Sequence, residues 1–117
     1  MSLVGLGPGL TPSGDDLVGA AFLAHRLLAA DPASAGRWRD CAGAVGAAAA
    51  ALTHPISAVL LGDLLDGLAY EALHDLLAAV RAARPHDALG ASAALIRIGH
   101  SSGWDMLAGV AVGLGAM

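Results

Sequence analysis

The stretch GLGPGLTPSGDD, from Gly5 to Asp16, joins a glycine- and proline-rich loop to two adjacent carboxylates. Apolar residues recur at helical spacing directly after it, so we expect a helix from about Asp15 to Ala30. A related pattern, Ser102-Gly103-Trp104-Asp105, precedes the last apolar stretch and shares the form Ser-Gly-x-Asp. The sequence therefore predicts that the first and last helices begin alike.

Turn residues divide the rest of the chain into further helical segments. The expected helices cover residues 15–30, 34–52, 55–66, 70–83, 87–98 and 104 to the C-terminus. Few residues favour strands, no low-complexity linker is present, and 117 residues suit one domain. We predict an all-α fold over residues 1–117: a compact single-domain bundle or array of about six helices, with glycine-rich loops at the N-termini of the first and last.

Charge and cysteine content exclude several classes of protein. Six Lys or Arg residues stand against ten Asp or Glu, and the net charge of −4 offers no basic surface for nucleic acid. The only cysteine, Cys41, has no partner for an internal disulfide, and the N-terminus does not resemble a signal peptide. These features predict a cytoplasmic protein that binds no nucleic acid.

One segment has the length of a membrane span. Residues 41–62 carry no formal charge, and a span needs about 20 apolar residues. Thr53-His54-Pro55 interrupts this segment with polar groups and a helix breaker. Two buried helices joined at this point are therefore favoured over a membrane protein.

Helix capping is the simplest interpretation of the two Ser-Gly-x-Asp patterns. In a capping box, Ser13 or Ser102 would accept a backbone N–H, and Asp16 or Asp105 would reach back to the capping residue. Further features of the first loop go beyond capping. They are the glycines at 5, 7 and 9, and the hydroxyls of Thr11 and Ser13.

Gly14 and Gly103 are the features that both loops share. Each lies just inside a predicted helix, where a missing side chain would open space over unpaired N–H groups. Helix N-termini of this kind hold anions. Such a cradle would complete a small-anion site at either helix entrance.

The carboxylates argue against a simple phosphate site, and two ligand types remain. In the first, a Mg²⁺ ion bridges carboxylate and ligand, held by Asp15, Asp16 and Asp105. In the second, the ligand is a small carbamoyl or ureido acid, whose amide end donates to the Asp side chains. His100 is a candidate titrating imidazole beside the second loop, or else a loop histidine bonded to backbone.

Several other residues receive structural interpretations. Cys41 is predicted to be an inert packing residue and Trp104 a core anchor. His25, His54, His74 and His86 show no zinc-type spacing, and we interpret them as surface or turn residues. The chain has no GxSxG, P-loop lysine or CxxC, so covalent catalysis has little support.

The two loops also carry a resemblance. GLGPGLTPSGDDLVGA (residues 5–20) together with IGHSSGWDMLAGVAVGL (residues 98–114) resembles the AllH-like family, associated with oxamate carbamoyltransferase in bacterial allantoin and purine-ureide breakdown. The resemblance implies a part in carbamoyl transfer between carbamoyl phosphate and oxamate, with partner subunits. Family members are longer and have a segment before the first motif, so it also implies that this chain corresponds to their helical C-terminal part.

We therefore expect the N-termini of the first and last helices to converge on one site for a small carboxylate or carbamoyl ligand. The alternative is a non-catalytic assembly module that docks a partner subunit or forms a homo-oligomer. No cofactor is implied apart from the alternative Mg²⁺. The catalytic candidates are Asp16, Asp105 and His100, and the ligand-binding candidates are Gly7, Gly9, Thr11, Ser13, Gly14, Asp15, Ser101, Ser102 and Gly103.

Overall fold

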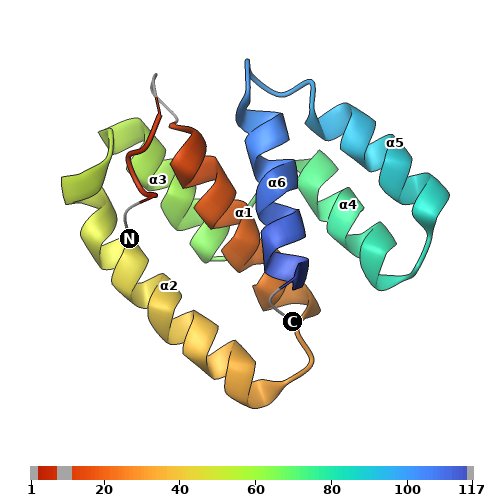
Figure 1. Cartoon of the computed structure of the whole chain (residues 1–117), viewed down its shortest axis with the longest axis horizontal. Helices are drawn as coiled ribbons and strands as arrows, with labels where there is room; N and C mark the ends of the chain where they lie inside the picture. The colour runs from red at the N-terminus through yellow and green to blue at the C-terminus, as the bar shows by residue number, and fades with distance from the viewer. Residues whose placement is uncertain (1–2, 8–11, 116–117) are drawn as a thin grey trace.

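The computed structural model describes residues 3–7 and 12–115, which contain six α-helices and no strand (Figure 1). The all-α prediction is confirmed, because each expected helix is present within a few residues of its expected bounds. The helices are α1 (Ser13–Leu28), α2 (Pro32–Leu52), α3 (Pro55–Leu65), α4 (Glu71–Arg81), α5 (Pro85–Leu95) and α6 (Ser102–Gly115).

Proline begins three of the helices. Pro32, Pro55 and Pro85 are the first residues of α2, α3 and α5, where a missing N–H costs nothing and φ is already helical. Asp31 caps α2 by accepting from the N–H groups of its second and third residues, and His54 Nδ1 accepts from the N–H of Ile56 in α3. Because proline fits the first turn, α2 and α5 begin two residues earlier than expected.

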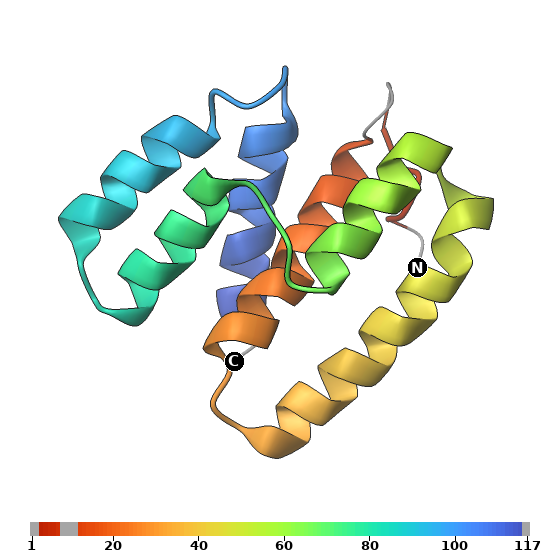
Figure 2. The ribbon, with the colours of Figure 1, turned by 180° about the vertical axis from the view of Figure 1, so that it is seen from behind.

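The first and last helices form the centre of the molecule. α1 and α6 pack closely along their length, and Figures 1 and 2 show them side by side with their N-termini at the same end. A Cβ built on Gly109 would lie 2.2 Å from the carbonyl oxygen of Leu17, and one on Gly113 would lie 2.6 Å from that of Ala21. Only glycine allows the two backbones to approach this closely.

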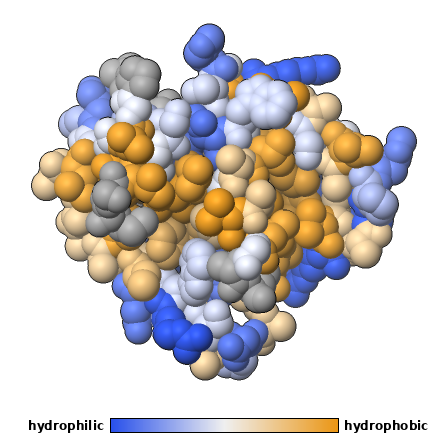
Figure 3. All heavy atoms as spheres, in the orientation of Figure 1, coloured by the Kyte–Doolittle hydropathy of each residue, from blue (hydrophilic) through white to orange (hydrophobic). Residues whose placement is uncertain are grey.

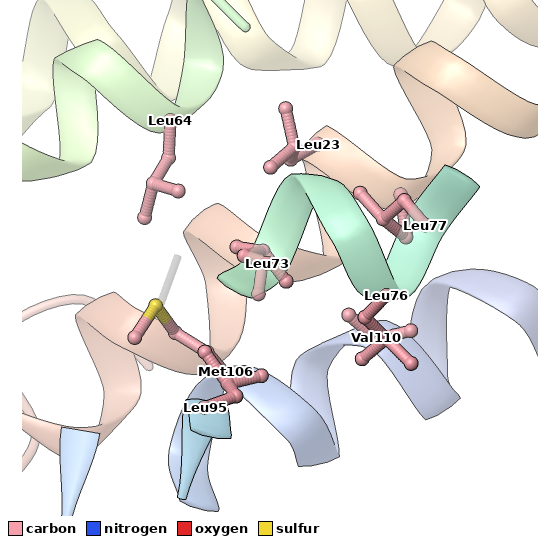
Figure 4. Packing of buried hydrophobic residues seen from close by; sticks show 10 residues of the cluster. Leu23, Leu64, Leu73, Leu76, Leu77, Leu95, Met106 and Val110 are labelled. Atoms are coloured by element: carbon pink, nitrogen blue, oxygen red, sulfur yellow. The ribbon is translucent and has the colours of Figure 1, made fainter. Parts of the chain in front are cut away.

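The core lies on both sides of α1. Towards α4, α5 and α6, one cluster is built mainly from large aliphatic side chains (Figure 4). Towards α2 and α3, a second cluster is built from smaller ones. The first includes Leu23, Leu64, Leu73, Leu76, Leu77, Leu95, Met106 and Val110; the second includes Val4, Val18, Val45, Ala49, Leu61 and Leu65.

The uncharged segment 41–62 does not form one continuous helix. It is divided between α2 and α3, with Thr53 and His54 between them. Within residues 3–7 and 12–115, no helix is both long and apolar enough to cross a membrane.

Three predictions about single residues are wrong. Trp104 is 58% exposed, because the inward side of α6 is occupied by Met106 and the two helix-packing glycines. Cys41 is exposed on α2. His25 is only 1% exposed, because its ring stacks on Trp38 with centroids 4.1 Å apart and its Nε2 lies 3.1 Å from the Ser34 hydroxyl.

Candidate functional site

Asp15 in the first turn of α1 is a structural carboxylate. It is 2% exposed, and its Oδ1 accepts from the Gly5 N–H at 2.7 Å. Its Oδ2 accepts from the hydroxyls of Thr53 and Ser57, each at 2.5 Å. These bonds attach the N-terminal loop and the start of α3 to α1. Both of its oxygens thus accept hydrogen bonds within the protein, and contact of Asp15 with a ligand or cation stays a prediction.

Asp16 lies towards α6 and receives far fewer hydrogen bonds. It is 8% exposed and accepts a hydrogen bond from the Ser102 side chain, while Asp105 is close enough to add negative charge. Within residues 3–7 and 12–115, Oδ2 of Asp16 and Oδ2 of Asp105 are buried without a hydrogen-bond partner. Two acids from distant parts of the sequence thus share one poorly solvated region.

Burial raises the pKa of Asp16 from 3.8 to about 6. The hydrogen bond from Ser102 lowers this pKa, while the neighbouring charges of Asp105 and Asp15 raise it further. A carboxyl group with this pKa is mostly ionised at pH 7 and can also take up a proton near neutrality. This is the range expected of a general acid or base.

A cavity of about 440 Å³ lies beside Asp16, a volume suited to a small molecule. α1, α3 and α6 contribute to its wall, together with the α3–α4 connection, which faces the viewer in Figure 2. Its polar lining residues are Asp16, Asp63, Tyr70 and Ser102, and its remaining lining residues are Leu60, Leu64, Leu68, Ala69, Ile98, Gly99 and Met106. Since none of these described residues is basic, the cavity favours a ligand that donates hydrogen bonds.

The glycines at the two helix entrances do not form an open anion cradle. A Cβ on Gly14 would lie 1.8 Å from the carbonyl oxygen of Leu3, and one on Gly103 would lie 1.9 Å from that of Leu95. Their N–H groups already donate to carbonyls of the preceding loops, at 2.9 Å for Gly14 and 3.1 Å for Gly103. The missing side chains therefore make room for the protein's own loop backbone, which corrects the expected role of both glycines.

Among the described residues, neither helix start has the geometry of the predicted capping box. Pro12 is the N-cap of α1 and makes no side-chain capping bond, so Ser13 is the first helical residue. In α6 the carbonyl of Ser101 accepts the N–H of Asp105 at 2.9 Å, which makes Ser102 the first helical residue. Each serine lies one position too far into its helix to cap it, and the Ser102 side chain instead crosses to Asp16.

The other predicted residues either do not line the cavity or fall outside the residues that the structure describes. Gly7 is exposed with φ of +119°, a conformation that favours glycine. Gly9 and Thr11 lie outside the described residues. His100 is exposed and does not line the cavity, although its neighbour Gly99 does. In the part of the chain that the structure describes, no three His, Cys, Asp or Glu side chains are grouped to hold a metal ion.

Two residues that line the cavity were not predicted from the sequence. Asp63 belongs to α3, and Tyr70 immediately precedes α4. In the sequence, Asp63 is the only charged residue of α3 and Tyr70 is a helix-start residue. Nothing in that pattern indicates that the α3–α4 connection brings both to the entrance of α6.

Residues 3–114 match the protein family described as oxamate carbamoyltransferase subunit AllH. The chain belongs to the AllH family. The match covers both glycine loops and all the helices between them, which confirms the resemblance noted in the sequence. No curated protein and no solved structure gives a significant match to this AllH-family chain.

Proposed function

We propose that this AllH-family chain is a ligand-binding subunit of a carbamoyltransferase, and that the cavity beside Asp16 holds the amide end of a small carbamoyl ligand or its acceptor. The buried Asp16 carboxylate carries this proposal. It borders a cavity of ligand size, and its Oδ2 has no hydrogen-bond partner among the described residues. A buried acceptor without a donor is costly, and a bound N–H group would remove that cost.

The charges around the cavity define which end of the ligand enters. Asp16 and Asp63 are acceptors for an amide or ureido NH₂ group, while the lining supplies no cation for a phosphate or carboxylate. The anionic end of oxamate or carbamoyl phosphate would therefore point outwards, where a partner subunit supplies positive charge. The family description as a subunit supports such an assembly.

Asp16 also suits the proton transfer that carbamoyl transfer requires. When an amide nitrogen attacks the carbamoyl carbon, the new N–C bond forms, the C–O bond to phosphate breaks, and the nitrogen loses a proton. With a pKa of about 6, Asp16 can accept that proton as a general base. Asp105, which raises this pKa, would act as the second acid of the pair.

Calorimetric titration with oxamate and with carbamoyl phosphate tests the proposal. We expect heat of binding for the unmodified protein and at least tenfold weaker binding for Asp16→Asn, which loses the charged acceptor. Asp75→Asn, on the exposed side of α4, is the matched control and should bind normally. Absence of binding by a folded sample, or equal affinities for the Asp16 variant and the control, would contradict the proposal.

A second candidate function is subunit assembly without ligand binding. Its support is the outward side of α6, where Trp104 is 58% and Val112 is 53% exposed beside Ala108 and Ala111. Figure 3 shows apolar side chains over much of this face of the molecule. If assembly is the only role, Val112→Glu should weaken association with partner subunits, and Asp16→Asn should change neither association nor activity.

A further inference from the structure

The second half of α2 is apolar on every side and yet mostly uncovered. No charged residue occurs from Cys41 to Leu52, and within this segment only Val45 and Ala49 are buried. A helix that is apolar all round is normally enclosed by protein. The molecule is only 19 Å deep along its shortest axis, so few of its helices can be enclosed by the chain itself.

A groove of about 530 Å³ runs along this helix, here called the α2 groove. Its lining residues are Phe22 of α1 and, on α2, Ser34, Arg37, Trp38, Cys41, Ala44, Val45, Ala48 and Leu52. The α2 residues recur every three or four positions, so they form one stripe. From Ser34 to Leu52 this stripe is about 27 Å long at 1.5 Å per residue, the length of a five-turn helix.

The charge of the α2 groove is confined to one end. Arg37 is the only ionised side chain among these lining residues, and it lies near the start of α2. The far end is formed by Ala44, Val45, Ala48 and Leu52. Small residues let another helix approach closely, and an exposed guanidinium favours a carboxylate beside it.

We propose that the α2 groove receives an amphipathic helix of a partner subunit, with an apolar stripe at helical spacing and a carboxylate that pairs with Arg37. The stripe would cover the exposed alanines and Leu52, and the carboxylate would fix the direction of the incoming helix. This inference is independent of ligand binding at Asp16.

A second copy of this chain fits the groove less well. If two α2 helices paired in antiparallel directions, Arg37 of each would face the alanine-rich end of the other, which has no carboxylate. If they paired in parallel, the two Arg37 side chains would repel each other, because Asp40, the only carboxylate within α2, does not line the groove. Charge complementarity therefore favours a different protein as the occupant.

Cys41 provides a direct test, because it is exposed, lines the groove and is the only thiol in the chain. The probe is a synthetic five-turn helical peptide with a leucine and alanine stripe and one glutamate at the end that meets Arg37. A twin peptide carries lysine at that position. The rate of Cys41 alkylation and the affinity of each peptide for the full chain are measured.

We expect the glutamate peptide to slow alkylation of Cys41 and to bind at least tenfold more tightly than the lysine peptide. Arg37→Glu should reverse this preference. Ala48→Glu should abolish binding, whereas Ala50→Glu, at an exposed position outside the groove lining, should leave it unchanged. All three substitutions are at exposed or surface-lining positions, and circular dichroism checks that each variant is folded.

Three results would overturn the proposal. The first is absence of protection of Cys41 by either peptide. The second is equal affinity of the two peptides, or equal loss of binding in the two alanine variants. The third is a dimer in sedimentation that Ala48→Glu dissociates, which would identify a second copy as the occupant.

Discussion

Asp15 and Asp16 are neighbours in the sequence and nearly equally buried, but they lie on two sides of α1 that supply different hydrogen-bond donors. Asp15 faces the start of α3, where one backbone N–H and two hydroxyls donate to it. Asp16 faces the start of α6, where it meets the Ser102 hydroxyl, the charge of Asp105 and a cavity. The supply of donors, more than burial, separates a carboxylate that holds the fold from one that is available for chemistry.

The largest effect on stability is expected from Asp15→Ala. The substitution leaves the Gly5 N–H and the hydroxyls of Thr53 and Ser57 without their acceptor inside the protein. We expect a loss of about 3–5 kcal/mol in the free energy of unfolding, measured by urea denaturation. Asp75→Ala, on an exposed surface, should change it by less than about 0.5 kcal/mol. Similar small losses for both variants would show that Asp15 is not a structural centre.

Asp16→Asn is expected to have the opposite effect and to raise the free energy of unfolding. The folded-state pKa of Asp16 is raised from 3.8 to about 6, so the charged form destabilises the fold. Its protonated form contributes stability that is complete below pH 3.8 and is lost as the pH rises through about 6. Asp16→Asn should therefore stabilise the protein by up to about 3 kcal/mol at pH 8 and hardly at all at pH 3.5.

This prediction is checked by urea denaturation of both proteins across that pH range. A pH-independent difference between them would contradict the raised pKa. A destabilised Asp16→Asn variant at pH 8 would show that the carboxylate has donors like those of Asp15.

Gly14→Ala and Gly103→Ala compare the two helix entrances directly. Each added Cβ would collide with a backbone carbonyl, that of Leu3 or that of Leu95, so we expect losses of about 1–3 kcal/mol. Gly36→Ala in α2 is the control, because its Cβ would meet nothing within 4 Å and alanine favours a helix. In thermal unfolding, Gly36→Ala should have a higher midpoint temperature than the unmodified protein. A Gly14→Ala or Gly103→Ala variant with unchanged stability would contradict the close backbone approach.

Ser102→Ala should have the smallest effect on stability, about 1 kcal/mol. It removes the hydrogen bond that lowers the Asp16 pKa, so that pKa should rise further above about 6. Titration of the Asp16 side chain by NMR measures this change. Ser101→Ala is the control, since Ser101 contributes its backbone carbonyl to α6 and should leave the Asp16 pKa unchanged.

The helices were predictable because they depend on local patterns. Apolar spacing and the prolines at 32, 55 and 85 mark the helices in the sequence itself. The roles of Gly14 and Gly103 were not predictable, because the carbonyls that occupy their Cβ positions come from loops whose path the sequence pattern does not reveal.

The site was only partly predictable for the same reason. The echo of Ser-Gly-x-Asp indicated that Asp16 and Ser102 belong to similar helix starts, and the parallel packing of α1 and α6 brings them together. The orientation of Asp15 depends on Ser57, which is 42 residues away, and the exposure of Trp104 depends on which side of α6 the glycines occupy.

The central pairing of α1 with α6 also constrains the order of folding. Residues 29–101 lie between these two helices, so a long loop must close before Gly109 can meet Leu17. During synthesis, α1 cannot pack against its main neighbour until α6 has left the ribosome. Contacts between such distant segments slow folding, so we expect the α4–α5 hairpin to form first and the central pair to lock the structure last.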